Sequence, residues 1–89
     1  MKIHFTKEFR KAYQKRIQSN VNLDKRFEAR YDLFEEDPTN PVLKDHALTG
    51  KLDGQRAFSI TGDIRVVYYI FEDTCYFIDI GTHNQVYGK

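Results

Sequence analysis

The chain has 89 residues, of which 30% are charged and 15% aromatic, and its formal net charge at pH 7 is +1. This length leaves room for one compact core, so we expect a single domain over residues 1–89. The lone Cys75 excludes an internal disulfide and favours a reducing cytoplasm, and no apolar stretch approaches the roughly 20 residues that a membrane span needs.

The N-terminal segment is basic although the net charge is small. Residues 1–16 contain only one acidic side chain, Glu8, against six basic ones: Lys2, Lys7, Arg10, Lys11, Lys15 and Arg16. Such a cluster is often a solvated helix face that serves solubility. It is also typical of a surface that follows the phosphates of a nucleic acid. The sequence leaves both interpretations open.

The first half of the chain predicts a short strand and two helices. Ile3 and Phe5 alternate with polar residues, and Thr6 is a suitable N-cap for a helix. Apolar residues then recur at helical spacing in two series, broken at Ser19-Asn20 and stopped at Asp37-Pro38: Phe9, Ala12, Tyr13, Ile17 and then Leu23, Phe27, Tyr31, Phe34. We therefore expect a helical hairpin.

The second half predicts three strands, over residues 57–61, 64–71 and 75–80. These runs are rich in β-branched and aromatic residues, and short polar breaks at 61–63 and 72–74 suit hairpin turns. Because an isolated meander leaves its apolar face wet, the opening strand must join this sheet and the helices must cover one face. The sequence thus predicts an α+β fold with a three-stranded antiparallel meander.

Several motifs in the second half resemble one known family. They are Leu43 to Gly50, Gly54-Gln55-Arg56, Asp63 to Tyr68, Gly81-Thr82-His83 and Val86-Tyr87-Gly88. Their order and spacing are similar to the RelE/ParE toxin superfamily, and the Lys44-Asp45-His46 and Gly81-Thr82-His83 segments are similar to its YafQ-like branch. The resemblance covers residues 43–88, and the expected order of elements agrees with a RelE-like fold.

The resemblance implies the toxin of a type II toxin–antitoxin system. Such a toxin is an mRNA interferase, an endoribonuclease that cleaves messenger RNA in the ribosomal A site without metal or cofactor. A small cognate antitoxin would restrain it in a heteromeric complex, and the free toxin would be a monomer. The cleavage is an attack of a ribose 2′-OH on the adjacent phosphate, which requires a base, an acid and positive charge near the phosphate.

Three residues are candidates for proton transfer on the strength of this resemblance. His83 follows the last strand, where we expect a loop to expose it, and His46 precedes the strands; imidazole titrates near neutral pH and so both accepts and donates protons. Asp63 would act as a base or orient a histidine. The competing interpretations are a surface histidine at a strand end, a loop histidine bonded to nearby backbone, and an aspartate that serves its turn.

The remaining candidates would bind phosphate or RNA. Arg65 and Arg56 carry guanidinium groups that bind phosphate through two hydrogen bonds, although a structural arginine is the alternative for each. Tyr87 would stack on a base or donate its hydroxyl proton, or simply pack on the sheet. Lys44 and Lys51 flank the same segment and would hold RNA or ribosomal phosphates as point charges, with solvated lysines as the alternative. The basic segment adds four candidates for such contacts: Lys7, Arg10, Lys11 and Lys15.

The chain departs from the YafQ-like pattern in the first meander strand. Ser59 and Ala57 occupy places where that pattern has a further His and an Asp. Two alternative functions therefore stay open, a ParE-like inhibitor that binds DNA gyrase and a degenerate toxin that only binds an antitoxin. A zinc site built from His46, His83 and Cys75 lacks ligand spacing, and His4 suits a structural role in the opening strand.

The nuclease hypothesis makes one spatial prediction. The imidazoles of His46 and His83 should meet one guanidinium and one carboxylate around a shared cavity sized for a phosphodiester.

Overall fold

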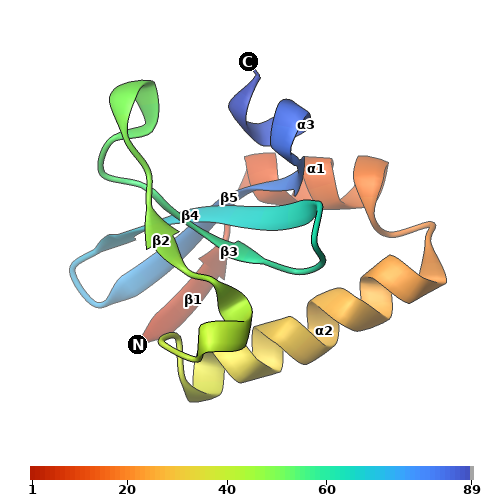
Figure 1. Ribbon diagram of the computed structural model, residues 1–89, viewed down its shortest axis with the longest axis horizontal. Helices are drawn as coiled ribbons and strands as arrows, with labels where there is room; N and C mark the ends of the chain where they lie inside the picture. The colour runs from red at the N-terminus through yellow and green to blue at the C-terminus, as the bar shows by residue number, and fades with distance from the viewer. Residues whose placement is uncertain (89) are drawn as a thin grey trace.

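The computed structural model describes residues 1–88 and contains one mixed sheet between two sets of helices (Figure 1). The strands are β1 (Lys2–Phe5), β2 (His46–Ala47), β3 (Arg56–Ser59), β4 (Ile64–Phe71) and β5 (Thr74–Thr82). The helices are α1 (Lys7–Arg16), α2 (Val21–Glu36) and α3 (His83–Tyr87), with 3-10 turns at Pro41–Leu43 and Gly50–Leu52. None of these helices is long and apolar enough to cross a membrane.

The sheet has the strand order β1-β5-β4-β3-β2. The pairs β3–β4 and β4–β5 are antiparallel, which confirms the predicted meander. The opening strand joins the sheet as predicted and pairs with β5 in parallel, an orientation that the long connection through α1 and α2 permits. Short β2 adds an edge that the sequence does not predict, pairing His46 with Ala57.

The two long helices begin at capping residues, of which Thr6 was predicted. Thr6 Oγ1 accepts a hydrogen bond from the Phe9 N–H at 3.2 Å, and Asn20 Oδ1 accepts one from the Leu23 N–H at 3.2 Å. Such bonds satisfy backbone donors that have no partner inside a helix. Helix α2 ends at Glu36, before Asp37-Pro38, as the sequence predicts.

Both long helices cover the same face of the sheet. Their apolar residues form one cluster with the inward residues of β3, β4 and β5, including the fully buried rings of Phe9, Phe34, Phe58 and Phe77. Phe34 and Phe58 stack with their centroids 4.5 Å apart. We call this side of the sheet the helix face.

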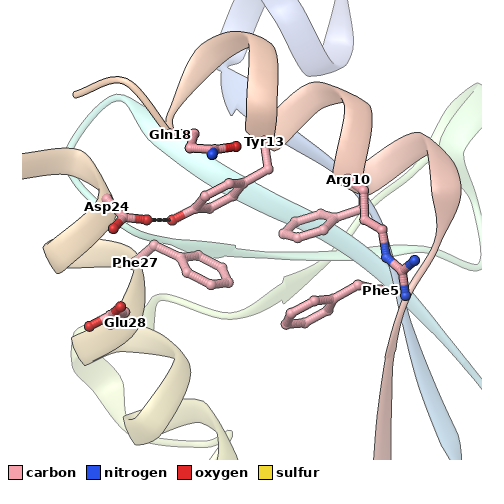
Figure 2. Close-up of a pocket in the computed structure, with 8 residues that line it drawn as sticks. Phe5, Arg10, Tyr13, Gln18, Asp24, Phe27 and Glu28 are labelled. Atoms are coloured by element: carbon pink, nitrogen blue, oxygen red, sulfur yellow. Dashed lines mark hydrogen bonds between the residues drawn. The ribbon is translucent and has the colours of Figure 1, made fainter. Parts of the chain in front are cut away.

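A slot of about 300 Å³ opens between α1 and α2, beside the core (Figure 2). Aromatic rings wall it, and charged groups stand at its rim: Phe5, Phe9, Tyr13 and Phe27, with Arg10, Asp24 and Glu28. The Tyr13 hydroxyl donates a hydrogen bond to Asp24 and so ties the two helices together (Figure 2). This slot lies on the helix face, away from the candidate histidines.

The opposite face of the sheet carries a smaller apolar cluster and helix α3. Ala57, Val67 and Val86 form the buried part of this cluster, and Leu48, Ile78 and Tyr87 pack against them. Figure 1 shows α3 and α2 on opposite sides of the sheet. We call this second side the open face.

Helix α3 corrects the prediction of a loop at His83. Thr82 accepts a hydrogen bond from the Gln85 N–H, and the Gln85 side chain accepts one from the Thr82 N–H, which forms a capping box. These reciprocal bonds start a helix directly at the end of β5. His83 is therefore the first residue of a helix, although it is exposed as predicted.

Candidate active site

The open face carries a hollow of about 290 Å³ in which every charged lining side chain is basic. Its lining residues come from α2, from β2 and the segment before it, from β3 and β4, and from the turn between these two strands: Arg30, Val42, Lys44, His46, Ser59, Thr61, Gly62 and Arg65. We call it the basic hollow. A lining that carries positive charge and no carboxylate favours the binding of a phosphate.

Strand register brings three of these residues together. His46 lies opposite Ala57, and Ser59 lies opposite Arg65. Because side chains alternate along a strand, His46, Ser59 and Arg65 all project from the open face. Phe58 and Val66 project from the helix face into the main core, which fixes this register.

The ring of His46 is held by local backbone. Its Nδ1 lies 3.0 Å from the carbonyl oxygen of Lys44, whose own backbone is left-handed with φ 51° and ψ 38°. A carbonyl only accepts hydrogen bonds, so Nδ1 carries the proton and the neutral ring keeps Nε2 as an acceptor. This bond is the one that the structural alternative requires, and it also fixes the orientation of the ring.

His83 lines a different hollow, of about 360 Å³, which lies beside helix α3 on the open face. Its other lining residues are Leu48, Thr49, Lys51, Leu52 and Tyr87. His83 and Tyr87 are one helical turn apart, and their rings meet edge to face with centroids 4.7 Å apart at 82°. We call this the terminal hollow.

Arg65 and Tyr87 connect the two hollows. The Cζ atom of Arg65 lies 5.6 Å from the centroid of the Tyr87 ring, within the range of a cation–π contact. The basic hollow therefore leads to the terminal hollow through the series Arg65, Tyr87 and His83. Instead of the predicted shared cavity, the two imidazoles line separate hollows on the same face.

Two polar atoms in this series are buried and lack a hydrogen-bond partner within residues 1–88. They are Nε of Arg65 and the hydroxyl oxygen of Tyr87. A buried polar group without a partner costs about 1–3 kcal/mol. The Tyr87 ring also packs on the small apolar cluster, so the packing alternative for this residue holds alongside its place in the site.

Asp63 lies exposed in the turn between β3 and β4, next to Gly62 of the basic hollow. The turn itself is closed by Thr61, whose hydroxyl oxygen accepts from the N–H groups of Asp63 at 3.1 Å and Ile64 at 2.9 Å. The carboxylate of Asp63 is thus not needed for turn geometry. Its catalytic role stays a prediction.

Arg56 belongs to a polar cluster on the helix face and not to either hollow described above. Its Nη2 lies 2.6 Å from Asp45 Oδ1, and the Tyr68 hydroxyl donates to the same carboxylate. The hydrogen bond with Asp45 raises the pKa of Arg56, while burial and the bond with Asp45 raise the pKa of Tyr68. The structure therefore places Arg56 as the structural alternative describes, although 43% of its side chain is exposed.

The predicted lysine contacts divide into two groups. Lys44 lines the basic hollow and Lys51 lines the terminal hollow, so both stand beside a candidate histidine. The remaining basic residues are exposed on α1: Lys7, Arg10, Lys11 and Lys15. Whether those four contact RNA or the ribosome stays a prediction.

Arg30 is the site residue that sequence analysis does not identify. From α2 its Nη1 donates to the carbonyl oxygens of Ser59 at 3.0 Å and Val42 at 3.2 Å, and the side chain lines the basic hollow. It therefore joins α2 to the two segments that carry His46 and Arg65. In the sequence it resembles any polar residue on a solvated helix face, since its partners are backbone atoms.

Cys75 is fully buried in the helix-face cluster, and burial raises the pKa of its thiol to about 12. It is therefore separated by the sheet from His46 and His83, which rules out the zinc site considered above. Within residues 1–88 no three His, Cys, Asp or Glu side chains gather closely enough to hold a metal ion.

Comparison with known protein families gives a match over residues 1–88 to the family described as bacterial toxin of type II toxin–antitoxin system, YafQ. This chain belongs to the YafQ toxin family. The fold agrees with that assignment, since the α+β sheet with its helices matches solved toxin structures over nearly the whole chain.

Solved structures similar to this YafQ-family chain include toxins from Helicobacter pylori and Escherichia coli. A metal-bound toxin from Helicobacter pylori is 27% identical with a TM-score of 0.76, covering 98% of this chain and 99% of that one. The DinJ-YafQ toxin–antitoxin complex from Escherichia coli is 26% identical with a TM-score of 0.69, covering 97% of this chain and 96% of that one. YafQ from Escherichia coli strain BL21(DE3) is 24% identical with a TM-score of 0.75, covering 97% of each chain, and it supports the fold alone. No curated protein sequence matches significantly.

The two departures from the YafQ-like motif have different surroundings. Ala57 is fully buried beneath Val67 and Val86, so a carboxylate at this position would lie within the small apolar cluster. Ser59 lines the basic hollow, where its hydroxyl replaces an imidazole. A serine hydroxyl does not serve as a general acid or base at neutral pH as an imidazole does, and within residues 1–88 His46 is the histidine that lines this hollow.

Proposed function

We propose that this YafQ-family toxin is an endoribonuclease that cleaves messenger RNA in the ribosomal A site and so arrests translation in the cytoplasm. The observation that carries the proposal is the basic hollow, where Arg30, Lys44 and Arg65 surround the oriented ring of His46. A phosphodiester is the ligand whose charge and size suit this set of groups.

Arg65 would hold the scissile phosphate. It lies at the junction of the two hollows, its guanidinium offers two parallel hydrogen bonds, and its Nε has no partner within residues 1–88. Lys44 and Arg30 add positive charge on the other side, which stabilises the negative charge that grows on the phosphorus oxygens during attack.

The two histidines would carry the two proton transfers. Nε2 of His46 accepts the proton of the ribose 2′-OH as that oxygen bonds to phosphorus, and the bond from phosphorus to the 5′ oxygen breaks. His83, in its protonated form, gives a proton to the departing 5′ oxygen. The products are a 2′,3′-cyclic phosphate and a free 5′-OH, and no metal takes part.

Tyr87 and Asp63 would support these steps. Tyr87 contacts both His83 and Arg65, so it fixes the acid relative to the phosphate ligand, and its ring can stack on a base at the terminal hollow. Asp63 stands at the rim beside Gly62, where a carboxylate can orient a protonated imidazole.

We also propose a small cognate antitoxin as the protein partner. The YafQ of Escherichia coli is found in a DinJ-YafQ toxin–antitoxin complex, and the matching chain of that complex covers 97% of the present chain. A protein that covers the open face would block the basic hollow.

Inducible expression tests the nuclease proposal. The wild-type protein and His83→Ala are expressed in a bacterium, growth is followed, and new 5′ ends in messenger RNA are mapped relative to codons. Asn84→Ala is the matched control, because Asn84 is the exposed neighbour of His83 on the same helix. We expect arrest with cleavage within codons from the wild type and the control, and loss of both from His83→Ala.

Other outcomes favour the alternatives. Growth arrest without new 5′ ends would support gyrase binding, and absence of arrest would support a degenerate toxin. Either result would contradict the proposed function.

A further inference from the structure

A second group of rings lies on the open face, four residues further along β4 than Arg65. Tyr69 and Tyr76 are paired in register and stack with their centroids 5.0 Å apart at 15°. The ring of His4 meets Tyr76 edge-on at 5.6 Å. The two tyrosines are partly exposed and His4 is exposed, so three neighbouring strands present aromatic rings to solvent.

The two tyrosines differ in their aromatic neighbours. Tyr76 has a ring on each side, whereas within residues 1–88 the ring of Tyr76 is the one aromatic ring beside Tyr69. On the other side of Tyr69 the register of β3 and β4, in which Arg56 pairs with Tyr68, continues to Gln55. The side-chain amide of Gln55 makes no hydrogen bond within residues 1–88, and it offers both donors and an acceptor.

A further hollow joins this position to the candidate active site. It measures about 340 Å³, and Gln55 and Tyr87 both line it, with Val67 and Ile78 as its floor. Lys51 supplies a cation. Its carboxylates are Glu8 and Asp79, and Asp79 is paired with Arg16 at 3.1 Å. At about 3.3 Å per residue, Arg65 and Tyr69 are about 13 Å apart along β4, a distance that a short single strand spans.

We propose that Tyr69 and Gln55 form a base-binding subsite for the message. A base of single-stranded RNA near the scissile phosphate would stack on the side of the Tyr69 ring that is turned away from Tyr76. Its edge would hydrogen-bond to the Gln55 amide. This inference rests on the proposed function, since the message is its ligand. A flat ring beside an unpaired amide suits a nucleobase better than an aliphatic side chain, and the acidic Glu72-Asp73 turn marks the far end of the path.

Direct binding is the first test. Fluorescent single-stranded 2′-O-methyl RNA, which cannot be cut, is titrated with wild-type protein, Tyr69→Leu, Gln55→Ala and Ile70→Thr. Ile70 is 49% exposed on the helix face of the same strand, so its variant is the matched control. Loss of one stacked base corresponds to a weakening of about five- to a hundredfold in Tyr69→Leu. We expect no change in Ile70→Thr, and we expect Gln55→Ala to reduce the preference among bases.

The second test identifies the RNA. On ribosomes programmed with a message, Tyr69→Leu should raise KM and leave the single-turnover rate unchanged, and this effect should disappear for a message made abasic near the cleavage site. An effect of equal size on both messages would mean that the rings contact ribosomal RNA. That result, unaltered RNA binding by Tyr69→Leu, or an equal loss in Ile70→Thr would overturn the subsite.

The outcomes for the two proposals are separable. If His83→Ala abolishes cleavage while Tyr69→Leu binds RNA as the wild type does, the nuclease stands and the subsite falls. If the wild type binds RNA through Tyr69 but cleaves no message, the nuclease falls and RNA binding by the open face stands.

Discussion

Arg65 is the residue on which phosphate binding most depends, because its guanidinium lies where the two hollows meet. A lysine keeps the charge but loses the fork that makes two parallel hydrogen bonds. We predict that Arg65→Lys lowers the single-turnover cleavage rate by about 10²- to 10³-fold, the range for loss of one preorganised donor. Arg26→Lys, at an exposed position of α2, should cleave like the wild type.

Unfolding in urea shows whether Arg65→Lys loses cleavage through the reaction itself or through lower stability. The free energy of unfolding of Arg65→Lys should stay close to that of the wild type. A variant that cleaves normally, or that loses activity only because it unfolds, would remove Arg65 from the mechanism.

Three buried or partly buried groups, Cys75, Tyr13 and Tyr68, should make the free energy of unfolding fall at alkaline pH. Burial raises the pKa of Cys75 to about 12, and burial together with a hydrogen bond to a carboxylate raises the pKa of Tyr13 and Tyr68. A pKa that is higher in the folded state favours folding fully below the unfolded pKa. This stabilisation is lost as pH rises through the folded value. The free energy of unfolding should therefore be flat to about pH 8 and fall above it.

A Cys75→Val variant isolates the thiol contribution. The unfolded thiol has a pKa of about 8.5, so at pH 10 the wild type should have lost about 2 kcal/mol more than the variant, measured by urea unfolding at pH 7 and pH 10. Because valine is larger than cysteine, each protein is compared at pH 10 with its own stability at pH 7. Parallel decline in both would show that the thiolate is no less stable inside the fold.

Helix α3 depends on the absence of a side chain at Gly81. A Cβ there would lie 2.6 Å from Gln85 Oε1 and 2.9 Å from Arg16 Nη1. Neither atom is free to move, because Gln85 completes the capping box and Arg16 donates to Asp79 and to the Ile80 carbonyl. Gly81→Ala should thus displace α3, and His83 and Tyr87 with it.

We expect Gly81→Ala to cost about 1–3 kcal/mol, the usual effect of overpacking, and to reduce cleavage more than stability alone explains. Gly62→Ala is the matched control for stability, because no atom lies within 4 Å of its added Cβ. Equal melting temperatures for the two variants would show that α3 does not depend on this close approach.

The contact between α1 and α2 depends on one polar bond beside the aromatic slot. The Tyr13 hydroxyl donates to the carboxylate of Asp24 (Figure 2). Tyr13→Phe should lower the free energy of unfolding by about 1.5 kcal/mol, the lower end for a hydrogen bond to a charged group. Tyr76→Phe is the control, because its hydroxyl makes no hydrogen bond within residues 1–88. An equal effect in both variants would contradict this account.

Over the whole molecule, strong periodicity predicted the large elements. The helices at 7–16 and 21–36 and the meander follow from regular apolar spacing, caps and turn residues. Helix α3 has five residues and β2 has two, too few for a periodic pattern to emerge. Those short elements carry His83 and His46, so sequence identified the candidate residues through the resemblance but missed the structure that positions them.

The neighbours within the candidate site were also only partly predictable, because some contacts follow from strand register and others from bonds to backbone atoms. Arg65 and Ser59 become neighbours through strand register, which the meander implies. Arg30 enters the basic hollow from a helix about 30 residues earlier, by bonding two backbone carbonyls. Backbone acceptors leave no trace in a sequence, because every residue has one. Arg56 could not be separated from Arg65 for another reason, since its partner Asp45 lies 11 residues away in the chain and meets it through the fold.

The central claim for the whole molecule is that both sides of the open face act on one phosphodiester. Single-turnover cleavage on programmed ribosomes, compared among wild type, His46→Ala, His83→Ala and the double variant, tests it most directly. Each single change should lower the rate by about 10²- to 10⁴-fold, and the double change should be little worse than the slower single variant, since a base and an acid serving one bond fail together. Wild-type cleavage by either single variant, or losses that multiply in the double variant, would contradict the account.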